Sequence, residues 1–436
     1  MSDKQSGDDS NVPVRRLAEW DADRLRDLAS EHGTPLYVTD LDRVAENCTR
    51  LRDAFPEADV KYAVKAHTGR AVLETVREAG LDAECASAGE VRRALDAGFS
   101  GDRVDYTAVN PPARDLDAVV DWWGDHPDLT TTVGARDTLD QLAERGYDGR
   151  ICVRVNPGVG AGHHAKVRTG AAPKFGVPYD RAAEVVADAR ERFEVVGIHA
   201  HAGSGIHGEE DLAAHRDLVA RMGELAREIG SDCGDEDGAL EFVDVGGGFG
   251  VPYRADDPAL DLDSVADATR EALGDVDATL AVEPGRYVVA DAAVLLTEVN
   301  TVKPTPDTTV AGVDAGMTDL LRPAMYDAYH AIRTLGAPDP HGDDGGSAAG
   351  DREVGPVTVA GPICETGDTF CDGRELPIPN RGDLLAVGNA GAYGYEMAST
   401  YNSRPRPAEV TVAGESLRER ETLAGVTRLE RGGADE

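Results

Sequence analysis

Lys65 is the residue whose setting points most directly to covalent chemistry. It lies in the apolar run YAVKA (62–66), part of the first of eight short strand-like runs along the chain. A strand buries its neighbours, and burial would lower the pKa of the Lys65 amine and make it nucleophilic. A lone lysine is usually a solvated surface cation, so the rest of the chain must supply a site around it.

Other residues that could take part in chemistry lie at the ends of the seventh and eighth runs. Gly246, Gly247 and Gly248 form a turn that lets backbone N–H groups approach a phosphate, although many glycine-rich turns are only turns. The turn EPGR (283–286) ends the eighth run. Glu283 is suited to keep a pyridine nitrogen protonated, and Arg286 is suited to clamp a phosphate or a carboxylate. The plainer alternative is a surface ion pair of little energetic value.

Two histidines and a cysteine complete the candidates. His201 lies in HAHAGSG, where its ring can stack on a flat cofactor and the nearby Ser204 can meet a phosphate. His199, two residues earlier, is assigned a structural role. Cys364 lies in GPICETGD, and a cysteine followed by an acidic residue and glycines in a loop is a candidate proton donor. Buried cysteines, by contrast, usually only pack.

The elements that must position these residues are alternating strands and helices. Amphipathic stretches separate the eight apolar runs, which are residues 60–66, 81–87, 104–109, 129–134, 151–156, 195–203, 240–248 and 280–286. This alternation predicts an α/β fold, a (β/α)8 barrel over residues 41–290, with the candidate residues at the carboxyl ends of its strands. An open doubly wound sheet is the alternative, but its glycine fingerprint would follow the first strand.

A second domain is expected after the barrel. Beyond residue 287 the helical rhythm stops, and short strands alternate with Pro and Gly, which predicts an all-β domain of residues 13–40 and 291–425. The strand-like segment TPLYVTD (34–40) is expected to pair with its sheet. Residues 1–12 and 426–436 are expected to be flexible tails, and residues 341–353 an exposed flexible insertion.

Composition limits the partners of the chain. A net charge of -37 with 41% hydrophobic residues indicates a globular protein and argues against nucleic acid or anionic membranes as partners. It is typical of a salt-adapted cytosol, with an unusually acidic mesophile protein as the alternative. The six cysteines form no CxxC pair, so no metal site is expected, and no apolar run reaches 18 residues. We expect a cytoplasmic protein.

Taken together, the motifs resemble the fold-type III pyridoxal-phosphate decarboxylases over roughly residues 30–415. The segments that carry the resemblance are YAVKA, HAHAGSG, VDVGGGFG, EPGRYVV, LLRPAMYDAYH, GPICETGDTF and GNAGAYGYEMAS, in the expected order. The resemblance implies pyridoxal 5'-phosphate as the cofactor and a homodimer with shared active sites. Two departures are Glu84, where the family usually has Asp, and Gly205, where it commonly has Gln.

The resemblance also implies a role for each matching residue. Catalysis is assigned to Lys65 as the Schiff-base lysine, to Cys364 as the proton donor and to His201 stacked on the ring. The residues implied to contact the cofactor are Lys65, His201, Ser204, Gly246, Gly247, Gly248, Glu283, Pro284, Gly285, Arg286 and Tyr393. Those implied to contact the substrate are Arg286, Arg322, Tyr326, Glu365 and Tyr393. Cys364 and Glu365 resemble a pair that the second subunit contributes.

The reaction implied is decarboxylation of a basic amino acid. We expect meso-diaminopimelate as the substrate and L-lysine and CO2 as the products, because Arg322 would grip a distal carboxylate that ornithine lacks. Ornithine, arginine and carboxynorspermidine remain alternative substrates. Amino-acid racemisation on the same fold resembles sites that have Arg at the ring nitrogen, so Glu283 argues against a racemase. Retention of Lys65, Glu283 and Cys364 argues against a non-catalytic relative.

Overall fold

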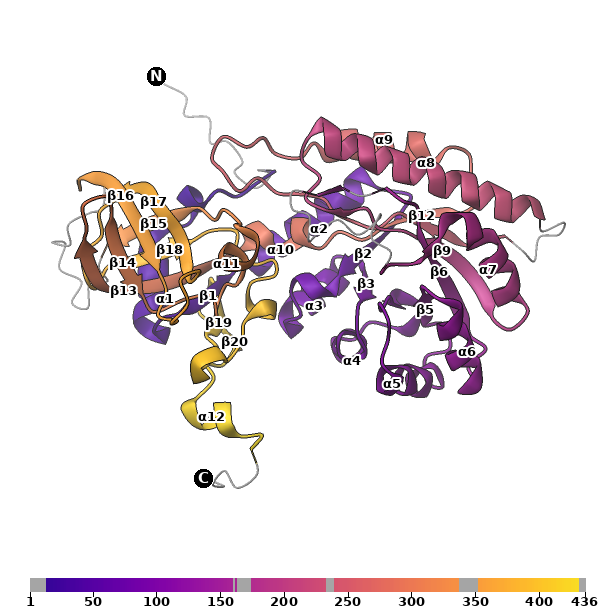
Figure 1. The fold of residues 1–436 in the computed structure, drawn as a ribbon, viewed down its shortest axis with the longest axis horizontal. Helices are drawn as coiled ribbons and strands as arrows, with labels where there is room; N and C mark the ends of the chain where they lie inside the picture. The colour runs from indigo at the N-terminus through magenta and orange to yellow at the C-terminus, as the bar shows by residue number, and fades with distance from the viewer. Residues whose placement is uncertain (1–12, 160, 163–173, 233–238, 337–351, 431–436) are drawn as a thin grey trace, which may run out of the picture. The chain divides into compact units, whose positions relative to one another are not determined.

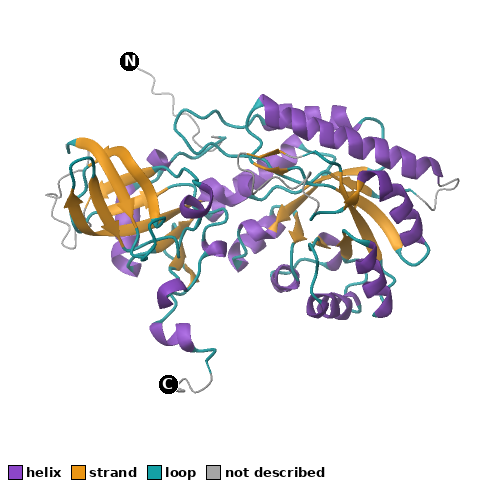
Figure 2. Ribbon diagram, in the orientation of Figure 1, coloured by secondary structure: helices purple, strands orange, loops and turns teal. Residues whose placement is uncertain are grey.

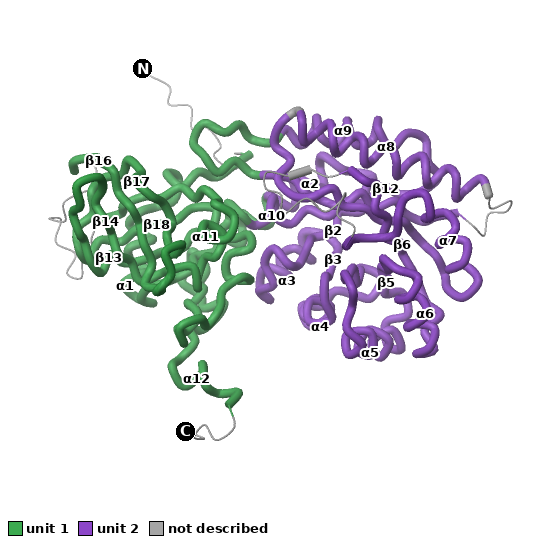
Figure 3. Tube along the Cα trace, viewed as in Figure 1, with its two compact units in different colours: residues 1–46, 251–260, 290–436 green, residues 47–250, 261–289 purple. Residues whose placement is uncertain are grey.

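The computed structural model describes residues 13–159, 161–162, 174–232, 239–336 and 352–430. The chain divides into two compact units (Figure 3). The barrel unit comprises residues 47–250 and 261–289, and the sheet unit comprises residues 1–46, 251–260 and 290–436. The predicted tail at 1–12, residues 431–436 of the predicted tail at 426–436, and most of the insertion at 341–353 lie outside the described residues. Val426 and Thr427 belong to a short helix, Leu423–Thr427.

Eight parallel strands close into a ring in the barrel unit. Each pairs with a neighbour on either side, and the pairings of β12 with β2 and of β5 with β6 complete the ring. The strands are β2 (Asp59–Ala63), β3 (Asp82–Cys85), β4 (Val104–Tyr106), β5 (Thr130–Val133), β6 (Arg150–Asn156), β9 (Glu194–His199), β11 (Phe242–Asp244) and β12 (Thr279–Val282). The predicted (β/α)8 fold is confirmed, in place of the open sheet.

Helices alternate with these strands and flank the ring (Figures 1 and 2). They are α2 (Leu41–Ala54), α3 (Arg70–Glu78), α4 (Ala88–Asp96), α5 (Ala113–Trp123), α6 (Arg136–Glu144), α7 (Ala182–Arg190), α8 (Glu209–Asp232), α9 (Leu262–Leu273) and the short α10 (Arg286–Val289). Side chains fix where some of them begin: Ser87 accepts a hydrogen bond from the Glu90 N–H at α4, and Asp261 accepts one from Ser264 at α9. The described residues include no helix long and apolar enough to cross a membrane.

Seven of the eight barrel strands end earlier than the apolar runs predict, β2 and β9 among them. Residues 60–66 read as one strand, but β2 ends at Ala63, and Val64–Ala66 form a single 3-10 turn. Likewise β9 ends at His199, so His201 lies beyond the strand. An apolar run in the sequence shows which residues are buried, but it does not show where the hydrogen bonds between strands end. A turn that is packed inside the protein is as apolar as a strand.

The sheet unit contains a mixed sheet. Its strands are β1 (Leu36–Thr39), β13 (Ala293–Pro304), β14 (Thr309–Val313), β15 (Ile332–Gly336), β16 (Val354–Ala360), β17 (Thr369–Pro377), β18 (Leu384–Val387), β19 (Ala408–Thr411) and β20 (Ser416–Arg418). The N-terminal strand β1 pairs antiparallel with β13 and parallel with β19, as predicted. Helices α1 (Ala22–His32), α11 (Arg322–Tyr326) and α12 (Leu423–Thr427) complete the unit.

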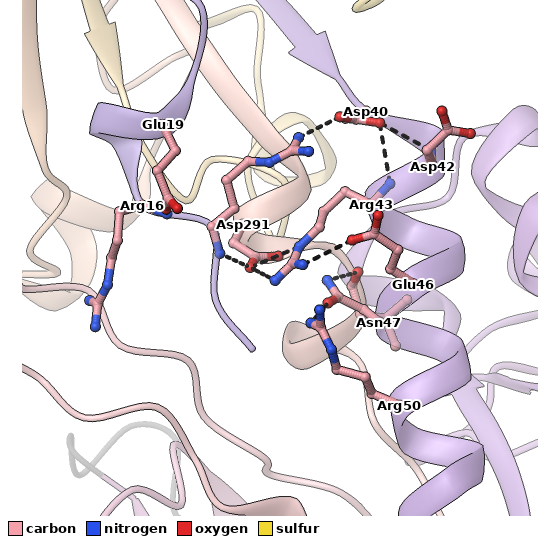
Figure 4. Close-up of polar contacts among 11 residues, drawn as sticks. Arg16, Glu19, Asp40, Asp42, Arg43, Glu46, Asn47, Arg50 and Asp291 are labelled. Atoms are coloured by element: carbon pink, nitrogen blue, oxygen red, sulfur yellow. Dashed lines mark hydrogen bonds and ion pairs between the residues drawn. The ribbon is translucent and has the colours of Figure 1, made fainter. Parts of the chain in front are cut away.

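A buried ion pair joins the first turn of α2, which follows β1, to the segment before β13 (Figure 4). The Arg43 guanidinium donates to Asp291 Oδ2 at 2.8 and 3.2 Å, and both side chains are buried. Asp291 also accepts from the backbone N–H of Arg15 at 2.9 Å. The Arg15 guanidinium in turn pairs with Asp40, whose other oxygen accepts from the first turn of α2. Removing one member would leave an unpaired buried charge.

Candidate active site

Lys65 lies on the turn after β2, with its amine against a carboxylate on the neighbouring strand. Its Nζ is 2.6 Å from Oε2 of Glu84 on β3. Glu84 is buried, but 39% of the Lys65 side chain is exposed. The Lys65 side chain is therefore only partly buried and not desolvated as expected, and its amine has a charged partner. Burial raises the pKa of Glu84, and the Lys65 charge opposes that rise.

The buried lysine of the barrel is Lys61, which the sequence analysis missed. Its amine pairs with Asp105 and lies 3.3 Å from Asp244, and it rests over the Phe242 ring. Burial acts to lower the pKa of Lys61, but the charges of Asp105 and Asp244 have the larger effect, so the pKa is raised overall. The amine is therefore a fixed cation and a poor nucleophile. The sequence did contain a signal for this site, because Lys61, Asp105 and Asp244 are charged residues inside apolar strands. A charge that is buried in this way needs a partner of opposite charge.

Glu283 follows β12 and is held by His199 at the end of β9. His199 Nε2 is 3.1 Å from Glu283 Oε2, and both side chains are buried. The other oxygen, Oε1, is buried and accepts no hydrogen bond from a described residue. Burial raises the pKa of Glu283, while Lys65 is the first of the cations that oppose the rise. One carboxylate oxygen is thus left available for a buried donor.

The glycine run contacts His201. The backbone N–H of Gly247 donates to His201 Nδ1 at 3.1 Å, so that nitrogen carries no proton. Burial and the Lys65 charge lower the pKa of His201, in agreement with a neutral ring. The N–H of Gly246 donates to Asp244 at 2.9 Å. Gly246 has a φ of 71°, and a Cβ at Gly247 would lie 1.9 Å from the Glu283 carbonyl oxygen, so only glycine fits both positions.

Arg286 is buried at the start of α10, where its guanidinium donates to Ser204 Oγ at 3.0 Å. Within the same turn, the carbonyl of Pro284 accepts from the N–H of Ala63, the last residue of β2, at 3.1 Å. The carbonyl of Gly285 accepts from Val288. The EPGR turn is therefore fixed to the strand that leads to Lys65.

Arg154, buried on β6, adds a cation to this set. Burial lowers its pKa, and the Glu283 and Glu84 charges raise it. The barrel unit thus brings together the predicted residues Lys65, His201, Ser204, Gly246, Gly247, Gly248, Glu283, Pro284, Gly285 and Arg286 at the carboxyl ends of its strands, the face on which barrel enzymes build their sites.

The predicted substrate residues lie in the sheet unit. Arg322 begins α11, is 3% exposed, and donates through Nη1 to the Tyr253 hydroxyl at 2.9 Å. The same nitrogen is 3.0 Å from His330 Nε2, which accepts because Nδ1 of that ring donates to the Gly388 carbonyl at 2.8 Å. Tyr326 ends α11. Tyr393, with a φ of 55°, has the left-handed backbone that only a fixed environment maintains in a tyrosine.

Cys364 and Glu365 lie in an exposed loop of the sheet unit. Two residues that the sequence analysis missed hold them: the Tyr401 hydroxyl donates to Glu365 Oε1 at 2.5 Å, and Asn402 Nδ2 donates to Cys364 Sγ at 3.3 Å. Asn402 has a φ of 57°. No signal in the sequence joins 364–365 to 401–402, because only the fold brings these segments together.

Comparison with known proteins identifies the family. Residues 41–290 match the family model described as "Pyridoxal-dependent decarboxylase, pyridoxal binding domain". The chain is 42% identical over 92% of its length to a diaminopimelate decarboxylase of Methanothermobacter thermautotrophicus, of which it covers 92%. The chain belongs to the diaminopimelate decarboxylase family. Enzymes of this family are carboxy-lyases that use pyridoxal phosphate, and this chain is one of them.

Solved structures agree with that membership. The diaminopimelate decarboxylase of Helicobacter pylori complexed with L-lysine is 31% identical and has a TM-score of 0.82, with 94% of this chain and 100% of that chain covered. A mutant of SrLDC in complex with PLP is 25% identical with a TM-score of 0.77, over 91% of this chain and 96% of that one. Relatives therefore bind the cofactor and a small amino acid on this fold.

Proposed function

We propose that this decarboxylase acts on meso-diaminopimelate and converts it to L-lysine and CO2. The observation that carries the chemistry is a pair of groups in the barrel, a partly exposed Lys65 side chain and a buried Glu283 oxygen that accepts no hydrogen bond from the described residues. The choice of substrate is supported by the similarity, over nearly the full chain, to relatives that carry this enzyme name.

The residues present fit pyridoxal phosphate. The buried Glu283 Oε1 is an acceptor that the N–H of a protonated pyridine ring would satisfy. The neutral His201 ring is suited to stack on a flat aromatic group. Arg286 and Ser204 already lie within a hydrogen bond of each other and supply donors for a phosphate. Gly248 adds a backbone N–H, and Gly247 would exchange its His201 contact for the phosphate.

Each barrel residue has one task in this scheme. Lys65 would hold the cofactor through its amine. Glu84 would hold the Lys65 amine as an ion pair when that amine is not bonded to the cofactor. Glu283 would keep the ring nitrogen protonated. When bound, pyridoxal phosphate accepts the electron pair that the departing CO2 leaves on the α-carbon.

The sheet unit would supply the groups for the rest of the substrate. Arg322 is oriented by Tyr253 and His330, so its fork is fixed for a carboxylate. Glu365 is suited to bind the distal ammonium group, and Tyr326 and Tyr393 of the sheet unit, with Arg286 of the barrel unit, would complete the contacts. Cys364 would donate the proton that replaces CO2 on the α-carbon.

We also propose a homodimer in which Cys364 and Glu365 serve the partner's barrel. Both are exposed in the single chain, yet their contacts with Tyr401 and Asn402 fix their positions. A cytoplasmic location is supported by the five described cysteines, which are all free thiols, since a reducing compartment keeps thiols unpaired. A salt-adapted source remains a prediction.

The test is CO2 release from a panel of amino acids. Purified protein with pyridoxal phosphate is incubated with meso-diaminopimelate, ornithine, arginine and carboxynorspermidine, and Lys65→Ala protein serves as the blank. We expect CO2 and L-lysine from meso-diaminopimelate, with the highest kcat/KM of the four. A higher kcat/KM for ornithine or arginine would overturn the substrate assignment and leave the cofactor assignment intact.

A further inference from the structure

His199 contacts the carboxylate that is proposed to bind the cofactor ring. It ends β9, while Glu283 follows β12, and β11 separates the two strands in the ring. The 3.1 Å distance between His199 Nε2 and Glu283 Oε2 joins two buried side chains, 2% and 4% exposed. A buried contact of this kind is shielded from water and therefore restricts both groups.

The proton of this contact belongs to the histidine. Burial, followed by the Arg154 charge, lowers the pKa of His199 to about 4, so the ring is neutral and has one N–H. Its Nδ1 is buried without a hydrogen-bond partner among the described residues, so the N–H lies on Nε2 and donates to Glu283. Glu283 Oε2 is then occupied, and Oε1 is the oxygen that remains.

Neighbouring charges determine what else this group can do. Atoms of His199, Asp244 and Glu283 lie within 4.8 Å of one another, a spacing that would also suit a metal ion. Asp244, however, already pairs with Lys61 at 3.3 Å and accepts from the Gly246 N–H. Since Lys61 neutralises Asp244 and His199 faces Glu283 with a proton, the three groups are engaged with each other, and we assign no metal.

We propose that His199 is a positioning residue, which holds one oxygen of Glu283 so that the other meets the protonated ring nitrogen of pyridoxal phosphate. A carboxylate that is free to rotate can point its two oxygens in several directions. When one oxygen is held by a hydrogen bond, the direction of the other oxygen is fixed as well. The inference deepens the proposed function and rests on its cofactor assignment. It gives a functional role to a histidine for which the sequence alone favoured a structural one.

Two amide variants of His199 provide the test. Glutamine can place its NH2 group near the position of Nε2, whereas the shorter asparagine reaches only the position of Nδ1. The dissociation constant of pyridoxal phosphate is measured for apo protein by fluorescence, and the melting temperature of each apo protein is the folding control. We expect His199→Gln to stay within about threefold of wild type and His199→Asn to bind at least tenfold more weakly.

A cofactor analogue separates positioning from general packing. In this analogue, carbon replaces the ring nitrogen, so Glu283 has no N–H to accept. If His199 acts through Glu283, wild-type protein and His199→Asn should bind the analogue equally, and His199→Asn should add nothing to Glu283→Gln for the natural cofactor. An equal loss of both cofactors, or additive losses in the double variant, would overturn the proposal. The substrate does not enter these measurements, so an error in the proposed substrate would not affect them.

Discussion

The charged groups inside the barrel and those of the Cys364 loop are organised in different ways. In the barrel, Lys61 is buried against Asp105 and Asp244, so each of these three charges has a partner from its own chain. In the loop, Cys364 and Glu365 are exposed. The barrel groups are held in place by buried ion pairs, and breaking such a pair costs much free energy. Pairing between exposed groups contributes little to stability.

The loop gains its geometry from the backbone instead. Buried Asp368 accepts hydrogen bonds from the N–H groups of Met317 and Ile363, at 2.5 and 2.7 Å, and these bonds hold the backbone of the loop in place. The facing segment has two consecutive non-glycine residues with positive φ, Asn402 at 57° and Ser403 at 53°. Strained backbone of this kind persists only where the surroundings enforce it, often at functional sites. This difference supports the proposal that the loop meets the surface of a partner subunit.

The largest effect should come from the lysine that the barrel leaves accessible. Lys65→Ala should lower kcat/KM by a factor on the order of 10⁴ or more, since it removes a covalent catalyst. Borohydride reduction of wild-type holoenzyme should fix the cofactor on the Lys65 peptide, as peptide mass spectrometry would show. Label on Lys61 would contradict the comparison, because that amine is held by two carboxylates.

The second prediction concerns the loop. If Cys364 serves the partner's barrel, Lys65→Ala and Cys364→Ala proteins should each be inactive and should regain activity when mixed. Random pairing makes half of the dimers mixed, each with one intact site of two, so about a quarter of wild-type activity is expected. The control is a mixture of Lys65→Ala with Glu283→Gln, which damages the same barrel half and should regain nothing. No recovery despite proven subunit exchange would place Cys364 in its own chain's site.

The fold was predictable because its signal is local. Eight apolar runs with helical stretches between them specify a barrel, and residues at the ends of those runs reach one face whatever their partners are. The charge pairs were not predictable in the same way. Lys61 and Asp105 are 44 positions apart, and each looks like a single charge in its own strand. Only closure of the ring makes them neighbours, and the same holds for His199 with Glu283, which are 84 positions apart.

The third prediction tests the buried pairing itself. Lys61→Met would keep the length of the side chain but leave Asp105 and Asp244 buried without their cation. Loss of one partner of a buried ion pair costs about 3–5 kcal/mol, so the unfolding free energy of the apo protein in urea should fall by about that amount. The matched control is Lys174→Met at an exposed position, with an expected change below about 0.5 kcal/mol. If Lys61→Met lowers the unfolding free energy by as little as the control does, the buried ion pairs of the barrel contribute no more to stability than the exposed groups of the loop.

The smallest effect should come from Arg322, the residue of the sheet unit that is proposed to bind the distal carboxylate of the substrate. Its guanidinium is buried between Tyr253 and His330, a geometry that presents a planar fork to a carboxylate. A lysine ammonium keeps the charge but cannot form two parallel hydrogen bonds. Arg322→Lys should therefore lower kcat/KM for meso-diaminopimelate by a factor equivalent to about 2 kcal/mol, the scale of one charge-assisted hydrogen bond.

The cofactor distinguishes this role of Arg322 from a structural one. If Arg322 binds the distal carboxylate, the visible absorbance of bound pyridoxal phosphate and the melting temperature should stay at their wild-type values while kcat/KM falls. The loss should also be specific, because ornithine has no distal carboxylate, so the residual activity with ornithine should be the same in both proteins. Parallel loss of cofactor and activity would mean that Arg322 supports the sheet unit through Tyr253 and His330 instead. In that case the firm hold on its guanidinium would serve the fold, as the pairing of Lys61 does in the barrel.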